Sequence, residues 1–272
     1  MKITKLLIRN LSGHFESDGE FWEERLVRPI DIYPEYEIEK HENWSLQKNK
    51  NVSTNSIFVE IHTDKDIYGT AGPIDSLQAD VIEKSLSKII LGKDPLAIEL
   101  LWDQMHRINV HGRQGITMMA ISAIDCALWD LKGKFYETPV FKILGGPTRK
   151  EVPAYASMLG FNVTDMGLVK ERSKYFKDQG YTAQKWFFRY GPMSGNEGLK
   201  KNIEMVKTLR ETLGDSYEIM LDCWQSMDYK YVVQLAKNIE EFRPYWFCLL
   251  YTSPKPTRQA EISYAVFCLK KK

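Results

Sequence analysis

The sequence has no long apolar run, no basic block and few cysteines. No stretch approaches the roughly 20 apolar residues of a membrane-spanning helix, and MKITKLLIRN at the start alternates too quickly for a signal peptide. Basic residues (37) nearly balance acidic ones (36), without the aromatic and basic interleaving typical of nucleic-acid binding. The four cysteines show no CxxC or metal-finger spacing, which indicates reduced thiols. We therefore expect a cytoplasmic protein without nucleic-acid or membrane partners.

What is present is the composition of a globular protein, with 43% hydrophobic and 27% charged residues among 272. Period-two alternation predicts strands at 2–9 and 56–63. The long polar stretch between them, Ser12 to Asn55, is a candidate flap. Apolar residues at helical spacing then predict helices, the last of them buried, at 77–92, 96–107 and 117–134.

From Val152 the pattern alternates between strand and helix and ends in YWF at 245–247. Such alternation predicts parallel strands joined by crossover helices, as in a doubly wound sheet or an eight-stranded barrel. No glycine fingerprint follows the first strand, which disfavours the dinucleotide-binding form of the doubly wound sheet. In either fold the chemistry belongs at the carboxyl ends of the strands. That rule selects Lys185, Asp222 and whatever follows Phe247.

Asp222 and Lys185 are the main candidate site residues. A carboxylate at the end of a strand suits a hard cation such as Mg2+, although a single Asp there is more often a turn or N-cap residue. A lysine at the neighbouring strand could neutralise a substrate carboxylate or, with a lowered pKa, move a proton; otherwise it is a solvated charge. Together, a metal and an ammonium ion would stabilise an enolate dianion.

Two weaker candidates are an arginine and a tryptophan. Arg113 lies in the glycine-flanked loop HGRQG, where it could reach a substrate or form a structural ion pair. Trp224 follows Asp222 closely and could line a substrate pocket or simply pack as an aromatic side chain.

The C-terminal tail, residues 248–272, can be back-translated into DNA that does not come from a natural gene. CLLYTS at 248–253 back-translates to TGT CTC TTA TAC ACA TCT, the transposon end used in DNA sequencing libraries. ISYAVFCL at 262–269 back-translates to the outer adaptor of the same libraries. Two matches in the expected order favour a translated sequencing-adaptor artefact over an ordinary lysine-rich terminus. We therefore predict that the chain is the truncated N-terminal part of a longer protein.

The segment AISAIDCALWDLKGKFYETPVFKILGG, Ala120 to Gly146, resembles the hallmark of the mandelate racemase and muconate lactonizing branch of the enolase superfamily. The resemblance implies an α/β fold: an α+β capping domain at 1–149, then an incomplete (β/α)7β TIM-like barrel at 150–247, about its first three to four strands. The strand end LDCW and the loop KWFFRYGP are most similar to the rhamnonate dehydratase group, which dehydrates acid sugars.

The resemblance also implies a mechanism. In this family three carboxylates from successive strand ends hold Mg2+, and Asp222 matches the first. The second lies in a strand that reads W-hydrophobic-E-E-P, which YWF begins without completing. Mg2+ and Lys185 would promote proton removal beside a carboxylate, giving an enediolate that expels a hydroxyl group. We therefore expect the parent to be a Mg2+-dependent acid-sugar dehydratase and a homo-oligomer, and the present chain to be inactive.

Other functions stay open at this point. Many relatives carry a second lysine as a base where this sequence has Phe187, which favours a dehydratase over a racemase or epimerase of the same superfamily. A third reading, from a different class, is a non-catalytic fragment that serves as a binding module.

Overall fold

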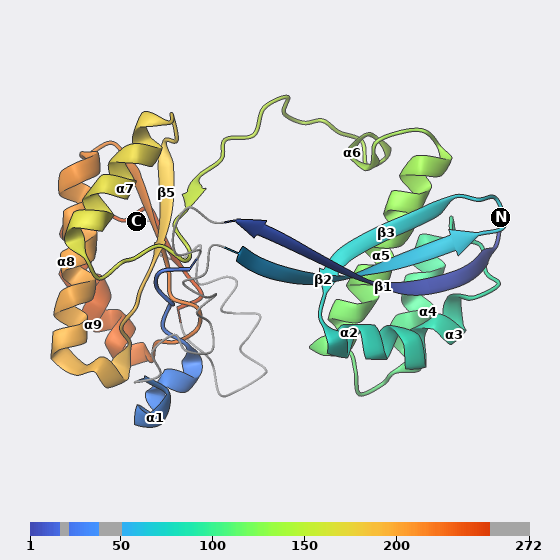
Figure 1. The fold of residues 1–272 in the computed structure, drawn as a ribbon, viewed down its shortest axis with the longest axis horizontal. Coiled ribbons are helices and arrows are strands. Elements are labelled where there is room, and N and C mark those ends of the chain that lie inside the picture. Colours follow the sequence, from blue (N-terminus) through green and yellow to red (C-terminus); the bar gives the residue numbers. More distant parts are fainter. Residues whose placement is uncertain (17–21, 38–50, 251–272) are drawn as a thin grey trace. The chain divides into compact units, whose positions relative to one another are not determined.

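The computed structural model describes residues 1–16, 22–37 and 51–250, which fall into two compact units (Figure 1). The first unit consists of Met1–Glu16 and Asn51–Val152. The second takes the described residues of Ser17–Lys50 and Pro153–Lys272. Residues 22–37 thus belong to a different unit from the strands that flank them in sequence. Within these described ranges, no helix is long and apolar enough to cross a membrane.

The first unit contains an antiparallel sheet in the order β1 (Ile3–Glu16), β2 (Asn51–Thr63) and β3 (Tyr68–Ile74). The predicted strands at 2–9 and 56–63 are confirmed but too short. Ser12 pairs with Asn55, so the ends of the candidate flap are strand, which corrects our prediction there. The sequence did not reveal β3, because Gly72 and Pro73 are unfavourable in strands; an edge position tolerates both.

Helices pack against this sheet, and one hydrophobic core lies between the sheet and the helices. Val59 and Ile61 of β2 pack into one hydrophobic cluster with Ile124 and Leu128 of the long central helix, and all four are fully buried. The expected buried helix at 117–134 is therefore confirmed. The helical elements are α2 (Ser76–Val81), a π-helical turn η2 (Ile82–Leu86), α3 (Ser87–Ile90), α4 (Ile98–Ile108), α5 (Ile116–Phe135) and α6 (Val140–Ile143).

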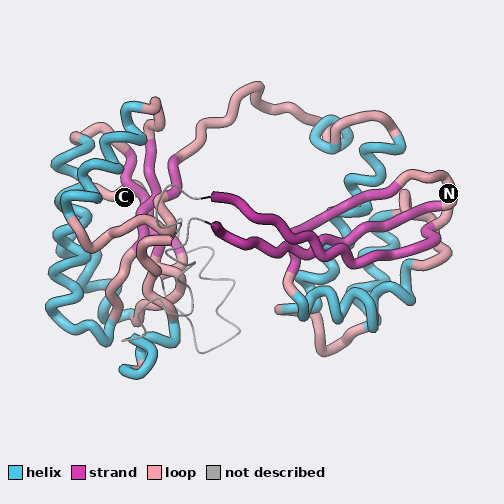
Figure 2. Tube along the Cα trace, viewed as in Figure 1, coloured by secondary structure: helices cyan, strands magenta, loops and turns pink. Residues whose placement is uncertain are grey.

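The second unit contains a parallel sheet whose strands, magenta in Figure 2, follow the order β4-β5-β6-β7. A doubly wound sheet reverses its strand order, whereas a barrel keeps the order consecutive, as this sheet does. Helices α7, α8 and α9 lie on the same side of the sheet (Figure 1). The strands are β4 (Ala156–Ser157), β5 (Ala183–Phe187), β6 (Glu218–Asp222) and β7 (Trp246–Cys248). The helices are α7 (Met166–Asp178), α8 (Gly195–Leu213) and α9 (Tyr229–Ile239), with shorter turns α1 (Pro34–Glu37), η1 (Pro29–Ile32), η3 (Pro192–Ser194) and η4 (Glu240–Phe242).

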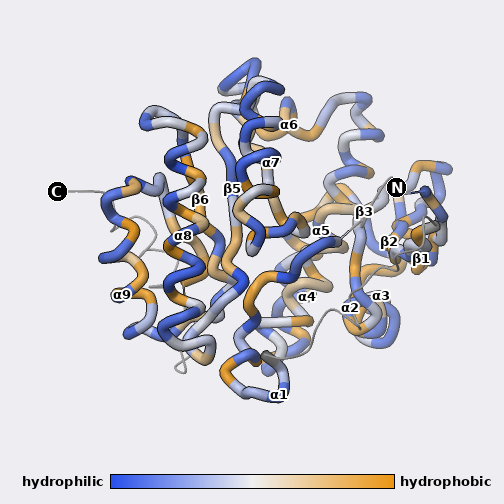
Figure 3. The backbone as a smooth tube through the Cα atoms, turned by 60° about the vertical axis from the view of Figure 1, so that its left-hand side comes forward, coloured by the Kyte–Doolittle hydropathy of each residue, from blue (hydrophilic) through white to orange (hydrophobic). Residues whose placement is uncertain are grey.

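The two faces of β5 separate packing from chemistry. Gln184 Nε2 donates to the carbonyl oxygen of Ser173 in α7 at 2.7 Å, so this residue faces the helices. Trp186, two positions on, shares that face and is fully buried. Hydrophobic and hydrophilic turns alternate along α8 and α9 in Figure 3, as expected of helices that bury one side against the sheet. Lys185 is left on the opposite face of β5.

Candidate active site

Lys185 and Asp222 meet on neighbouring strands. The buried apolar residues Ile219 to Leu221 hold β6 in the sheet and place Asp222 at its carboxyl end. Lys185 does not end its strand, as the sequence suggested, because β5 continues through Phe187, the register partner of Asp222. The Lys185 side chain therefore starts two residues before Asp222 in the register and extends toward it. Its Nζ lies 3.0 Å from Asp222 Oδ2. The Lys185 and Asp222 side chains are only 19% and 8% exposed.

Asp222 fixes the charge of Lys185. Burial by itself lowers the pKa of Lys185, but the hydrogen bond and negative charge of Asp222 outweigh burial, and the pKa is raised from its ordinary value. The Tyr155 ring, 5.9 Å from Nζ, also faces the ammonium group. Lys185 is therefore cationic at neutral pH. A lysine with a lowered pKa, one of the two roles that the sequence left open, is not what this arrangement produces.

The strand end on the other side of Asp222 carries a thiol. Cys248 of β7 is the register partner of Asp222 in the parallel pair β6 and β7. Burial, together with the negative charge of Asp222, raises the pKa of Cys248 to about 12, so the thiol is neutral at physiological pH. A carboxylate thus lies between an ammonium group and an uncharged thiol.

The turn after Asp222 is conformationally unusual. Trp224 and Gln225 both adopt positive φ, at 47° and 60°, a region that non-glycine residues rarely occupy. The Trp224 amide donates to Asp222 Oδ1 at 3.1 Å, which orients the carboxylate. Trp224 as a whole residue is 46% exposed. The structure therefore brings the backbone of Trp224 to Asp222, while a substrate contact by its side chain stays a prediction.

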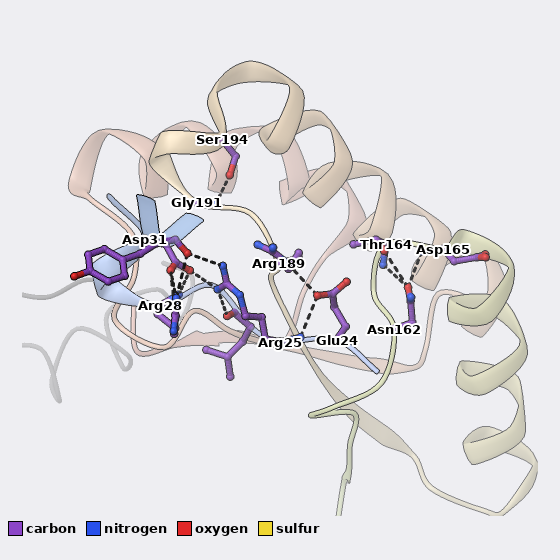
Figure 4. Close-up of polar contacts among 12 residues, drawn as sticks. Glu24, Arg25, Arg28, Asp31, Asn162, Thr164, Asp165, Arg189, Gly191 and Ser194 are labelled. Atoms are coloured by element: carbon purple, nitrogen blue, oxygen red, sulfur yellow. Dashed lines mark hydrogen bonds and ion pairs between the residues drawn. The ribbon is translucent and has the colours of Figure 1, made fainter. Parts of the chain in front are cut away.

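Residues 22–28, called the strap below, bind across the strand ends of the second unit, and sequence reasoning missed them. The Val27 amide donates to the carbonyl oxygen of Phe188, just beyond β5, at 2.8 Å. Arg189 Nε donates to Glu24 Oε1 at 3.0 Å (Figure 4). Arg172 of α7 forms a two-pronged ion pair with Glu23. The acidic pair in WEER was the available signal, but its partners lie about 150 residues away in sequence, at separations of 149 and 165.

A buried ionic cluster folds the strap onto the turn that follows it. Asp31, 4% exposed, accepts from Arg25 Nη1 at 2.5 Å and from Arg28 Nη2 at 2.9 Å (Figure 4). Burial lowers the pKa of Arg25, and the hydrogen bond with Asp31 opposes that effect. This cluster gives a segment without apolar periodicity a defined shape.

Arg113 belongs to the first unit. It lies in the loop between α4 and α5 and is exposed. Lys185 and Asp222 belong to the second unit, so the role of Arg113 in substrate binding stays a prediction.

The side chains around Asp222 show whether the described residues could hold the expected Mg2+ ion. Mg2+ is held by hard oxygen ligands, commonly one or two carboxylates with waters and substrate oxygens. Asp222 offers such a carboxylate, but both of its oxygens already accept hydrogen bonds, and its flanking partners are Lys185 and Cys248. Across the part of the chain that the structure describes, no group of three or more His, Cys, Asp or Glu residues could hold a metal ion. The described residues alone therefore do not complete a Mg2+ site.

A capping unit followed by a consecutive parallel sheet with charged strand ends defines an enolase-like class of α/β protein. Residues 44–145 match the mandelate racemase / muconate lactonizing enzyme N-terminal domain, and residues 167–247 match the enolase C-terminal domain-like family. The chain belongs to the mandelate racemase and muconate lactonizing branch of the enolase superfamily. The family predicted from Ala120 to Gly146 is confirmed.

Curated relatives share both units. A provisionally named L-rhamnonate dehydratase of Caldivirga maquilingensis is 35% identical over 223 residues, which are 81% of this chain and 52% of the relative. The L-rhamnonate dehydratase of Saccharopolyspora erythraea is 30% identical over 256 residues, 90% of this chain and 60% of the relative. The chain thus spans about half to three fifths of these relatives.

Solved structures show the same fold. L-rhamnonate dehydratase from Gibberella zeae superimposes with a TM-score of 0.75 at 26% identity, covering 99% of this chain and 63% of that one. A racemase from Streptomyces coelicolor A3(2) with bound magnesium gives a TM-score of 0.70 at 25% identity, covering 97% and 67%.

Proposed function

We propose that the chain is the N-terminal part of a Mg2+-dependent acid-sugar dehydratase, a hydro-lyase whose second unit begins a (β/α)7β barrel. The observation that carries the proposal is the contact between Lys185 of β5 and Asp222 at the carboxyl end of the neighbouring strand β6. Relatives named as L-rhamnonate dehydratases support the substrate class. The proposal includes a cytoplasmic homo-oligomer that acts on a small acid sugar and has no nucleic-acid or membrane partner.

The reaction needs positive charge around a carboxylate. Removing the proton beside a carboxylate concentrates two negative charges on the resulting enediolate, and preorganised cations stabilise it. Mg2+, when bound in the full-length protein, would supply part of that charge. Lys185, held as an ammonium ion, would donate hydrogen bonds to the same substrate oxygens once a substrate competes with Asp222. In this proposal Asp222 is a cation ligand and orients Lys185 before substrate arrives.

Phe187 distinguishes dehydration from racemisation. Side chains alternate along β5, so Phe187 shares the face of Lys185, and it is only 2% exposed. An aromatic ring cannot accept or donate the proton. A two-base racemase would need a basic side chain at this position, and a buried aromatic side chain stands there instead. This difference supports the dehydratase.

The test is turnover of acid sugars by the full-length protein. A panel of aldonic acids that begins with L-rhamnonate is incubated in D2O with Mg2+ and followed by proton NMR. We expect loss of substrate and formation of a 2-oxo-3-deoxy acid in at least one case. Deuterium exchange at C2 without loss of water would instead indicate a racemase or epimerase. A panel left unchanged would refute both.

A further inference from the structure

The chain makes a tight turn directly after β6, and Ser226 closes it. The Ser226 amide donates to the carbonyl oxygen of Cys223 at 3.0 Å, and the Ser226 hydroxyl group donates to the same oxygen. Cys223, Ser226 and Met227 are buried, at 0%, 3% and 3% exposed. The two central residues, Trp224 and Gln225, are exposed. The turn is therefore anchored at both ends, while its two central side chains are in contact with solvent.

The two central residues are unusual for this kind of turn. Positive φ at both Trp224 and Gln225 is the signature of a type I′ turn, which favours Asn and Gly at these positions. Other side chains are strained there, because in the left-handed region the Cβ lies too close to the following carbonyl oxygen. An Asn-Gly pair would form the same turn with less strain. Turn formation therefore does not explain the tryptophan.

Core packing does not explain the tryptophan either. Trp224 is 46% exposed, whereas a tryptophan that stabilises a core is largely buried. Among the described residues, Cys223 and Met227 belong to the hydrophobic cluster of the second unit, and Trp224 does not. A strained residue that neither favours its turn nor fills a core is typical of a functional site.

The turn places Trp224 beside the candidate site. Its amide donates to Asp222 Oδ1, so the indole leaves the backbone at the same strand end as that carboxylate. An acid sugar carries a chain of C–H and O–H groups beyond the carboxylate that cations bind. An indole offers an apolar face for the C–H groups and one N–H donor for a hydroxyl oxygen. The chemistry of the indole thus matches the carbon chain of such a substrate.

We propose that the strained turn holds the Trp224 indole against the carbon chain of the acid sugar, which makes Trp224 a specificity-determining residue. The inference rests on the proposed function, because it takes an acid sugar bound at Lys185 and Asp222 as the ligand. The indole contacts the part of the chain beyond C2 and C3, the carbons that react. Loss of the indole therefore weakens the binding of long acids and leaves short acids unaffected.

The experiment compares the full-length protein with two variants of the turn. Trp224→Asn combined with Gln225→Gly removes the indole and supplies the Asn-Gly pair that suits a type I′ turn. Gln225→Gly alone is the matched control, because it relieves strain in the same turn and keeps the indole. With Mg2+ present, we measure KM for the six-carbon aldonic acid that the protein turns over. We also measure the inhibition constant of lactate, a three-carbon 2-hydroxy acid, and the thermal unfolding midpoint.

We expect the double variant to raise KM about three- to tenfold relative to Q225G, because an aromatic contact with the substrate is lost. The inhibition constant of lactate should stay unchanged, since lactate ends before the indole. Both variants should unfold about 1–2 °C above the unmodified protein, because glycine and asparagine tolerate positive φ. A KM equal to that of Q225G, an equal loss for both acids, or a midpoint of the double variant below that of the unmodified protein would each overturn the inference.

Failure of this inference is distinguishable from failure of the proposed function. A full-length protein that dehydrates an aldonic acid, combined with an unchanged KM in the double variant, would remove only the role of Trp224. A full-length protein that dehydrates no aldonic acid would remove the dehydratase proposal and overturn the role of Trp224 with it.

Discussion

At the scale of single residues, the charge state of Lys185 follows from one neighbour. The sequence predicted the strand that carries Lys185 but placed the lysine at its end, whereas the structure has it in the middle of β5. The pKa of Lys185 was not readable from the sequence, because the pKa depends on Asp222, 37 residues away, and on how deeply the pair is buried. Sequence identified the two residues, and only the register of β5 and β6 established their contact and the ammonium form.

Asp125 in α5 is a second residue whose environment sets its pKa. Burial, and next the negative charge of Glu99, raise the pKa of Asp125 from its ordinary value. The folded state therefore binds this proton more tightly than the unfolded state does. The free energy of unfolding falls as pH rises from the pKa of Asp125 in the unfolded state through its pKa in the folded state. Ionised Asp125 therefore lowers stability at neutral pH, and protonated Asp125 does not do so in acid.

Asp125→Asn should therefore raise the thermal unfolding midpoint at pH 7. The difference from the parent should vanish near pH 3, where Asp125 is protonated in both states. Glu99→Gln, which removes the second cause, should give part of the same gain. An unchanged or lower midpoint for D125N at pH 7 would show that burial of the Asp125 carboxylate carries no such penalty.

At the scale of elements, β3 packs on α5 through a glycine. A Cβ at Gly69 would overlap the carbonyl oxygen of Ala127 and lie 2.8 Å from the backbone nitrogen of Leu131. Backbone atoms of a buried helix cannot move aside cheaply. We expect Gly69→Ala to lower the free energy of unfolding by about 1–3 kcal/mol or more. The control is Gly13→Ala, whose Cβ would meet only Thr54, at 3.9 Å. Equal losses for the two variants in denaturant titrations would refute the close approach.

Ion pairs hold the strap to its unit in addition to the apolar packing of Leu26 and Val27, which are buried in the hydrophobic core of that unit. Glu23 accepts from Arg172 and from the Asn162 amide, and both side chains of the ion pair are about one fifth exposed, at 19% and 21%. Glu23→Gln should cost about 1 kcal/mol and speed hydrogen exchange at the Glu23 and Glu24 amides, which donate to Gly160.

Glu197→Gln serves as the matched control for the strap. Its partner is Lys200, and both side chains are more than two thirds exposed, at 78% and 71%, so little stability should be lost. If E23Q and E197Q leave exchange at the strap equally unchanged, the ion pair does not hold it.

Periodicity predicted most elements of both units, and the exceptions share a cause. Helix α5 and strands β5 and β6 were foreseen because buried faces impose regular apolar spacing. Strand β3 and the strap were not, because one is a glycine-containing edge and the other is fixed by long-range ion pairs. Of the candidate site, the sequence supplied Lys185 and Asp222, whereas Glu24 and Arg189 needed the fold.

At the scale of the whole molecule, the chain matches both family domains but spans about half to three fifths of its curated relatives. The predicted domain limits 1–149 and 150–247 and the predicted adaptor origin of 248–272 stay predictions; residues 251–272 lie outside the described part of the structure. We expect DNA that spans codon 247 to continue with an acidic codon at 248 and further strand-forming sequence. A stop codon directly after Lys272 in the source genome would contradict the adaptor origin.

The 272-residue chain itself should not turn over acid sugars. Within the described residues, the Asp222 carboxylate and the Lys185 ammonium group do not supply both a complete Mg2+ site and a base. Incubation with the aldonic acid panel and Mg2+ should leave every substrate unchanged by proton NMR. Dehydration by this chain at a rate above that of its Lys185→Met variant would show that the described half suffices.

The roles proposed for Lys185 and Asp222 are best tested by the rate of L-rhamnonate dehydration by the full-length protein and its K185M variant. We expect turnover with Mg2+, loss of turnover on chelation, and a fall in kcat of about 10²–10³ in K185M, because an ammonium group that stabilises the enediolate is removed. Turnover that persists in K185M, with the variant folded, would contradict the catalytic role of the Lys185 and Asp222 pair.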